Sequence, residues 1–150
     1  MESDQRSLRK KALPLLVIEN NEDHQLLIGY CLRTKIPQVE PIFASTVNET
    51  LAFLKLSVIH KKIFPSLILL DLYLPKLTDG FNLLKEIRTS YPPLPVIVLS
   101  TQSEAGLVEK AYALGAHSFL TKPFNLDEWE NLFKILNEYW LGTVTLPKGE

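Results

Sequence analysis

The stretch Leu67-Ile68-Leu69-Leu70-Asp71 decides the fold. Four consecutive aliphatic residues suit one short buried strand and are too few for a helix of ordinary length. A strand that is apolar on both faces is typical of a parallel sheet with helices packed on both sides. The run stops at a carboxylate. We therefore predict a central strand with Asp71 placed at its carboxyl end.

Short apolar runs recur on both sides of this stretch and alternate with longer amphipathic ones. The runs predict further strands at residues 15–18, 39–44, 96–99 and 118–120. Thr46 with Glu49 resembles a capping box that opens the second helix, and a third helix is expected to follow Gly80. Gly115 is placed as the cap that ends the fourth helix, and the last helix is expected from Asn125 to about residue 139.

Five strands that are each followed by a helix predict an α/β fold with a doubly wound parallel sheet. Functional sites in such sheets lie at the carboxyl ends of the strands. The polar residues at those ends are expected to converge on one crevice; they are Glu19, Asn20, Asp71, Ser100 and Lys122.

These residue types suit phosphoryl chemistry. Aspartate is a competent nucleophile towards phosphorus and forms aspartyl phosphate. Lys122 can contact a phosphoryl oxygen, and the Ser100 hydroxyl can donate to another. Oxygen atoms of Glu19 and Asn20 suit Mg²⁺, which takes few protein ligands. An isolated aspartate after a strand is more often a cap, so the prediction depends on the whole group.

The arrangement resembles the response-regulator receiver domain of two-component systems. The resemblance rests on four stretches in order, LLVIENNED (15–23), LILLDLYLPKLTDG (67–80), VIVLSTQ (96–102) and ALGAHSFLTKPF (113–124). It implies a flavodoxin-like (βα)5 fold with strand order 2-1-3-4-5.

The resemblance also implies roles for single residues. Asp71 would be the phosphoacceptor, Lys122 the phosphate-binding lysine and Ser100 the switch hydroxyl. Phe119 would be the switching aromatic, with a plain core residue as the alternative. Lys122–Pro123 would be a candidate cis bond. The implied Mg²⁺ ligands are Glu19, Asn20, Asp71 and the backbone carbonyl of Tyr73.

Two positions depart from the family pattern. Asn20 replaces the second acid of the metal site, which removes one charge. The loop after Asp71 reaches Gly80 one residue late, although Pro75 keeps its usual place.

Composition bounds the remaining expectations. The chain has 150 residues, a formal net charge of −1 and one cysteine. We expect a tail at 1–12, one receiver domain at 13–140 and an extension at 141–150, with no direct DNA binding and no membrane span. A single Cys31 fits a cytoplasmic protein, in a small buried position. The histidines His24, His60 and His117 share no metal spacing and are expected at the surface or its boundary.

The resemblance implies a single-domain response regulator that receives its phosphoryl group from a histidine kinase and signals through an unidentified downstream protein. It also implies that the protein is not an enzyme, apart from catalysing its own phosphorylation and dephosphorylation. The tail at 139–147 is similar to those of regulators that partner cyanobacterial phytochrome kinases, although it could equally fold back on its own domain. The large residues Trp129, Phe133, Tyr139 and Trp140 predict a homodimer through the last helix and the tail.

The same residues bear on three other functions. A pseudo-receiver, a binding module that works without phosphorylation, is favoured by Asn20 and opposed by Asp71, Ser100 and Lys122 together. A phosphohydrolase would require a second acid where Tyr73 stands. In a flavin carrier of the flavodoxin type, the acids Glu19, Glu22 and Asp23 after the first strand would repel the phosphate of the flavin.

Overall fold

The computed structural model describes residues 12–147. Its five strands form one parallel sheet in the order β2-β1-β3-β4-β5, as predicted. The strands are β1 (Leu13–Ile18), β2 (Val39–Ala44), β3 (Leu67–Leu70), β4 (Val96–Ser100) and β5 (Ser118–Thr121). The helices are α2 (Glu22–Lys35), α3 (Val47–Ile59), α4 (Leu77–Ser90), α5 (Ala105–Ala113) and α6 (Leu126–Leu136). A short 3₁₀ turn, η1 (Lys61–Ile63), follows α3, and a π-helical turn, η2 (Asn137–Leu141), follows α6.

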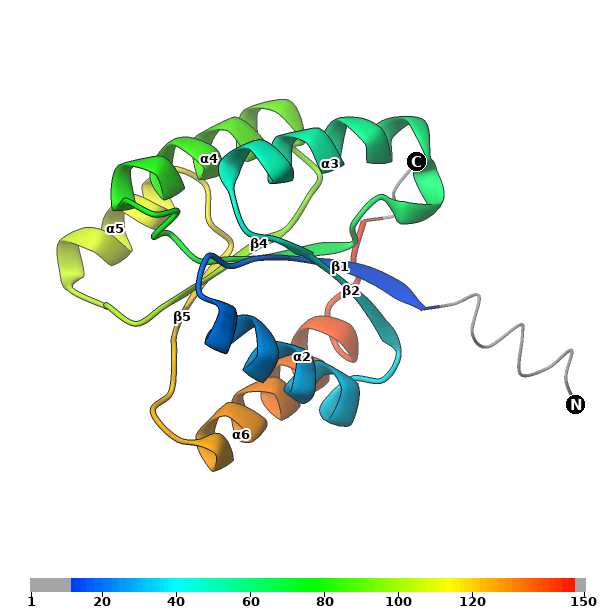
Figure 1. Ribbon diagram of the computed structural model, residues 1–150, viewed down its shortest axis with the longest axis vertical. Helices are drawn as coiled ribbons and strands as arrows, with labels where there is room; N and C mark the ends of the chain where they lie inside the picture. The colour runs from blue at the N-terminus through cyan, green and yellow to red at the C-terminus, as the bar shows by residue number, and fades with distance from the viewer. Residues whose placement is uncertain (1–11, 148–150) are drawn as a thin grey trace, which may run out of the picture.

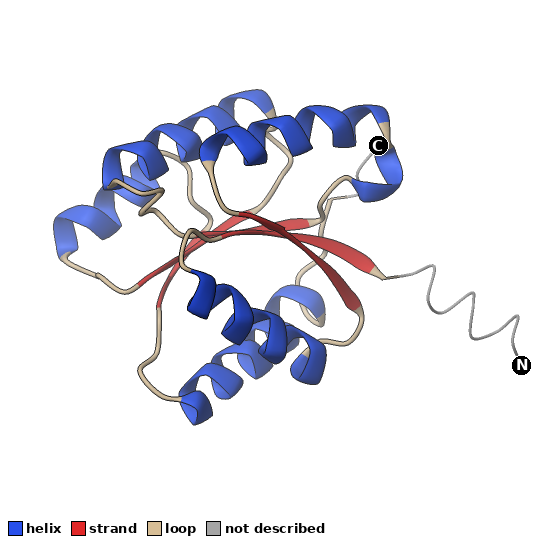
Figure 2. Cartoon of the chain, viewed as in Figure 1, coloured by secondary structure: helices blue, strands red, loops and turns tan. Residues whose placement is uncertain are grey.

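The molecule has three layers. Helices α3, α4 and α5 cover one face of the sheet, and α2 and α6 cover the other (Figure 1). Coloured by secondary structure, the strands form a twisted central layer between the two groups of helices (Figure 2). This is the doubly wound arrangement, and it leaves the carboxyl ends of the strands open for a site.

Alternate residues of the central strands supply the two halves of the core. Leu16, Ile68 and Val96 pack on the side of α3, α4 and α5. Leu15, Leu67 and Ile97 pack on the side of α2 and α6, where Trp129 and Phe133 complete the cluster. Because both faces are covered, the strands read as continuous apolar runs.

Helix α4 begins at Leu77, earlier than the predicted start after Gly80, so this expectation is wrong. The Asp79 carboxylate accepts the backbone N–H of Lys76 at 3.3 Å and stabilises the first turn. Gly80 therefore lies inside the helix. A Cβ atom at this position would lie 1.8 Å from the carbonyl oxygen of Leu72, so only glycine lets α4 approach the chain after β3.

Other helix ends follow the predicted chemistry. Thr46 Oγ1 accepts the Glu49 N–H at 3.0 Å, and Glu49 Oε1 accepts the Ser45 N–H at 2.8 Å. Asn125 Oδ1 accepts the Glu128 N–H at 2.9 Å and opens α6. Gly115 has a φ of 106°, the left-handed conformation expected after a helix end.

The described part of the extension folds back on its own domain. Trp140 and Leu141 pack against the core on the side of α2 and α6. Further along, Pro147 borders a small hollow with residues that precede β3 and β4, among them Pro65 and Pro95. The predicted tail at 1–12 lies outside the described residues, apart from Ala12.

His117 joins β4 to β5. Its ring Nδ1 accepts the backbone N–H of Val96 at 3.0 Å, and the backbone N–H of His117 donates to the Val96 carbonyl at 2.9 Å. Burial and the positive charge of Arg88 lower the pKa of His117 from 6.5. A neutral ring is also the form that can accept from Val96.

This geometry predicts a pH dependence of stability. Because the folded pKa of His117 is lowered, the unfolded chain binds the proton more readily, and stability is lost as the pH falls through and below 6.5. Thermal melting at about pH 7.5 and about pH 5 measures this loss. His117→Asn keeps an acceptor where Nδ1 lies but does not titrate, so its loss is expected to be smaller. An equal loss in both proteins would contradict this role.

Candidate functional site

Three residues at strand ends meet at the carboxyl edge of the sheet, and backbone hydrogen bonds fix them there. The Glu19 N–H donates to Ala44 at 2.9 Å, the Asp71 N–H to Ile18 at 2.9 Å, and the Lys122 N–H to Ser100 at 2.7 Å. Each bond continues the pairing of neighbouring parallel strands. The positions of these three side chains are therefore set by the sheet itself.

Lys122 is the centre of the site. Its Nζ lies 2.7 Å from Glu19 Oε1 and 3.5 Å from Asp71 Oδ2. All three side chains are buried, with exposed fractions of 3% for Lys122, 1% for Glu19 and 9% for Asp71. A buried ammonium between two carboxylates is compensated on both sides.

The surroundings of Asp71 disfavour the charged form of its carboxyl group. Burial, and then the negative charge of Glu19, raise the pKa of Asp71 from 3.8 to about 6, although Lys122 opposes the shift. Asp71 Oδ1 also accepts the Tyr73 N–H at 3.2 Å, which orients the carboxylate. One lysine therefore does not fully balance the two acids, and the site can accept further positive charge.

A cavity of about 230 Å³ opens in front of Asp71. Its walls include Asn20, Tyr73 and Lys122 as predicted, and also Asn21, His24, Pro75 and Thr101. Asn20 is exposed and its Nδ2 donates to the Ser45 carbonyl at 3.2 Å, so the amide oxygen stays free to accept. The cavity is large enough for a phosphoryl group and a few waters.

The oxygen donors around this cavity fit Mg²⁺. Asp71, Asn20 and Tyr73 line the cavity and supply a carboxylate, an amide oxygen and a backbone carbonyl. The Glu19 carboxylate is buried next to Lys122, where it accepts from Lys122 Nζ and from the Asn21 N–H. Oxygen donors of these kinds are the hard ligands that Mg²⁺ takes. Within residues 12–147 no three His, Cys, Asp or Glu side chains form a metal cluster.

Among residues 12–147 no hydrogen bond or ion pair joins Ser100 or Phe119 to Asp71. Ser100 is fully buried, and its Oγ accepts the Gln102 N–H at 3.2 Å. The neighbouring Thr101 borders the cavity instead. Phe119 is half-buried, packs against the core on the side of α3, α4 and α5, and its N–H donates to the Tyr112 hydroxyl at 3.0 Å. The sheet thus brings Glu19 and Asp71 into contact with Lys122, while the two switch candidates have other partners.

The expectation of a cis bond at Lys122–Pro123 is wrong. Among residues 12–147 the cis bond joins Leu74 and Pro75, in the loop that borders the cavity. Lys122 needs no such bond, because its backbone is still held by Ser100 and its side chain reaches Glu19 directly.

His24 is the site residue that sequence reasoning missed. Its Nδ1 lies 2.9 Å from Lys122 Nζ, and its ring borders the cavity. It is the third residue of α2, the helix that starts just after β1, and Asn21 caps that start by accepting the His24 N–H at 3.0 Å. Its place in the first turn beyond a strand end was the available signal. Glu22 and Asp23 are exposed and outside the cavity wall.

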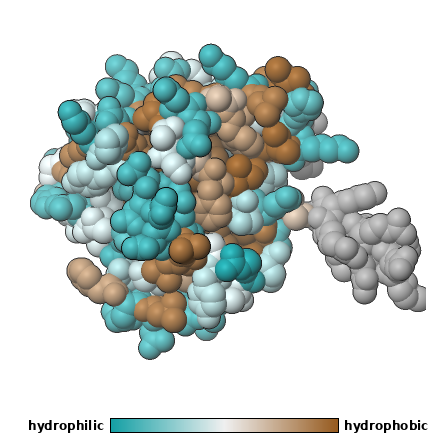
Figure 3. Space-filling view, in the orientation of Figure 1, coloured by the Kyte–Doolittle hydropathy of each residue, from teal (hydrophilic) through white to brown (hydrophobic). Residues whose placement is uncertain are grey.

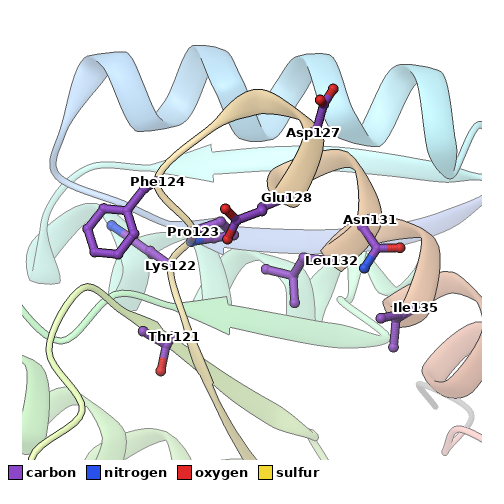
Figure 4. A pocket seen from close by; sticks show the side chains of 9 residues that line it. All are labelled: Thr121, Lys122, Pro123, Phe124, Asp127, Glu128, Asn131, Leu132 and Ile135. Atoms are coloured by element: carbon purple, nitrogen blue, oxygen red, sulfur yellow. The ribbon is translucent and has the colours of Figure 1, made fainter.

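A second hollow of about 440 Å³ lies beside α6, on the surface formed by the loop after β5 (Figure 4). Pro123 and Phe124 form one side, and Leu132 and Ile135 of α6 lie along the other. Phe124 is 96% exposed. Another apolar patch gathers over the carboxyl end of α3 (Figure 3), where Leu56, Val58 and Ile59 are exposed.

No helix among residues 12–147 is long and apolar enough to cross a membrane.

Comparison with known proteins agrees with the fold. The family model for the response regulator receiver domain matches residues 15–134. Response regulator Rcp1 of Synechocystis is 33% identical over 89% of this chain and 92% of its own length. The probable methanogenesis regulatory protein FilR2 of Methanothrix harundinacea is 29% identical over 89% of this chain and 86% of its own length.

Solved structures lead to the same family. The Mn²⁺-bound form of Rcp1 superposes with a TM-score of 0.78 at 33% identity, covering 90% of this chain and 99% of that one. The phosphorylated cyanobacterial phytochrome response regulator RcpA superposes with a TM-score of 0.80 at 32% identity, covering 90% and 98%. With its strand order, its buried Glu19–Lys122–Asp71 contact and these matches, the chain belongs to the response regulator receiver domain family.

Proposed function

We propose that this receiver accepts a phosphoryl group on Asp71 from a histidine kinase and passes the signal on by protein contacts. The observation that carries the proposal is the Lys122 ammonium, held by Glu19 beside Asp71 at the edge of a cavity of phosphoryl size. An Asp71 oxygen would bond to phosphorus while the bond from phosphorus to the kinase histidine nitrogen breaks. Stabilisation of the transferring group is largely electrostatic.

The residues of this chain divide the work. Lys122 binds a phosphoryl oxygen and balances the charge that arrives with it. The Tyr73 N–H holds one Asp71 oxygen so that the other faces the cavity. The Ser100 hydroxyl, now bonded to Gln102, can turn to a phosphoryl oxygen after transfer. Mg²⁺, when bound by Glu19, Asn20, Asp71 and the Tyr73 carbonyl, would neutralise developing negative charge.

The output face is expected at α5, β5 and α6. Exposed apolar side chains already lie there, namely Tyr112, Phe124, Leu126 and Ile135. Phosphorylation replaces the single charge of the Asp71 carboxylate with about two negative charges on the phosphoryl oxygens, and this change shifts a pre-existing equilibrium at the output face through Ser100 and Phe119. The kinase is expected to be of the phytochrome type because Rcp1 and RcpA are similar over most of the chain, and the protein is expected in the cytoplasm without direct DNA binding.

Intact mass after incubation with phosphoramidate or acetyl phosphate and Mg²⁺ tests the proposal. The expected result is the addition of one phosphoryl group. A protein that is folded, binds Mg²⁺ and gains no mass would contradict it. A binding module independent of phosphorylation is not favoured, because the contact of Lys122 with both acids is complete despite Asn20.

Asn20→Asp is expected to tighten Mg²⁺ binding by roughly 10- to 100-fold, because an added charge near a divalent ion outweighs the extra dehydration of a carboxylate. Loss of the Asn20 bond to Ser45 opposes part of this gain. Calorimetric titration with Mg²⁺ measures the change, and phosphorylation by small donors is expected to be faster. Asn48→Asp, an exposed position outside this cavity, is the matched control for charge alone. Equal effects of both substitutions would exclude Asn20 as a ligand.

The homodimer stays a prediction, and the structure supports it less than the sequence did, because not all of its large aromatic residues lie at the surface. Trp129 and Phe133 are 3% and 0% exposed and belong to the core, so the surface patch expected from them is absent. Tyr139 is 54% exposed and stays available. Sedimentation of the intact chain at high micromolar concentration measures the dimer fraction. A monomer under those conditions would exclude the dimer.

A further inference from the structure

His24 connects the cavity in front of Asp71 to the buried face of α6. On one side its Nδ1 lies 2.9 Å from Lys122 Nζ. On the other, its ring lies against Trp129, with ring centroids 6.1 Å apart and planes at 46°. Trp129 is 3% exposed and stacks on Phe133 at 6.3 Å. One side chain thus touches both the charged centre and the aromatic core beneath it.

The chemistry of the contact fixes the state of the ring. An ammonium group has only donors, so the His24 Nδ1 accepts and the ring proton lies on Nε2. Burial and the charge of Lys122 lower the pKa of His24, which favours the neutral ring that can accept.

Lys122 Nζ donates to two acceptors in the resting state and pairs with a third group. Glu19 Oε1 lies at 2.7 Å and His24 Nδ1 at 2.9 Å, and Asp71 Oδ2 lies further away, at 3.5 Å. A phosphoryl group on Asp71 places oxygens that together carry about two negative charges in the cavity in front of Asp71. To bond one of these oxygens the ammonium has to shift from its present position, which strains its two contacts. A charged acceptor holds an ammonium more strongly than a neutral one, so the contact with Glu19 is kept and the contact with His24 is lost.

We propose that His24 is a positioning residue which holds Lys122 in the resting state and, when Lys122 turns to the phosphoryl group, transmits its release to Trp129 in α6. The inference rests on the proposed phosphorylation of Asp71. It adds a second route to α6, on the α2–α6 side of the sheet, beside the route through Ser100 and Phe119. Helices α2 and α6 are also joined at the surface, where Tyr30 Oη lies 3.5 Å from Glu130 Oε2.

The test uses Trp129 as its own reporter. Trp140→Phe leaves Trp129 as the single indole of the chain, since the sequence has two tryptophans. Indole emission depends on the groups packed against the ring, so release of His24 is expected to change the intensity or wavelength of Trp129 emission. Intact mass is measured on the same samples during treatment with phosphoramidate and Mg²⁺.

Two substitutions at His24 separate its two contacts. In the Trp140→Phe background, His24→Asn keeps an acceptor near Lys122 but removes the ring, and most of the emission change is expected to disappear. His24→Phe keeps a ring against Trp129 but removes the acceptor. Loss of that resting hydrogen bond is expected to speed phosphorylation about three- to tenfold, and His24→Asn is expected to rescue most of this difference.

The outcomes are distinct. If Asp71 gains no phosphoryl group, the proposed function fails and this inference fails with it. If Asp71 is phosphorylated but Trp129 emission changes equally with and without the His24 ring, the inference alone is overturned. An unchanged rate in His24→Phe would also overturn it. His24 is 30% exposed, so both variants are expected to fold, and thermal melting checks this.

Discussion

Asp71→Asn is expected to abolish the mass increase produced by phosphoramidate or acetyl phosphate with Mg²⁺. The amide at this position is not a nucleophile towards phosphorus, and Asp71 is the only carboxylate that both follows the central strand and faces the cavity with Lys122 among residues 12–147. The expected change is complete loss, measured by intact mass. Asp23→Asn is the matched control, since Asp23 is exposed at the same edge of the sheet but outside the cavity.

The Asp71→Asn variant is also expected to stay folded. Burial and Glu19 raise the pKa of Asp71 to about 6, so its charged form at about pH 7.5 opposes folding and the neutral amide does not. In buffer without Mg²⁺ the variant should therefore melt at or above the temperature of the wild type. A phosphoryl group that still appears on a folded Asp71→Asn protein would show that another residue is the acceptor.

Gly80→Ala is expected to cause the largest loss of stability. The new Cβ would lie 1.8 Å from the Leu72 carbonyl oxygen and 2.4 Å from its carbon, so α4 or the chain after Asp71 must move. Overpacking of this severity costs roughly 3 kcal/mol, which corresponds to a fall of about 6–12 °C in melting temperature for a domain of this size. Because Leu72 is next to Asp71, phosphorylation by small donors should also slow.

Gly106→Ala is the control for this substitution. Nothing lies within 4 Å of a Cβ at Gly106, which is in α5. Alanine is the better helix former, so this variant is expected to gain about 0.5–1 kcal/mol. The two glycine variants should therefore shift the melting temperature in opposite directions. A Gly80→Ala protein as stable as the wild type would show that α4 can withdraw from Leu72 without cost.

Much of this protein could be predicted from its sequence, because the deciding signals are local. Short, wholly apolar runs such as residues 67–70 predict buried parallel strands, and the chain between them has room for helices. Parallel strands place all their carboxyl ends at one edge, so Glu19, Asp71 and Lys122 were expected together, and they are in contact. Cap residues such as Thr46 and Asn125 act over three positions and were also predictable.

The tertiary structure decided two kinds of feature. One is the direction in which a side chain points, and the other is a contact between segments that lie far apart in the sequence. Apolar size does not say which way a side chain points, and only the packing of α6 on α2 shows that Trp129 and Phe133 are core residues. The start of α4 depends on the close approach of Gly80 to Leu72, a contact that no local pattern encodes. His24 and Lys122 are 98 positions apart, and no spacing rule relates them. They meet because β1 and β5 end at the same edge of one sheet, which also places the His24 ring against Trp129.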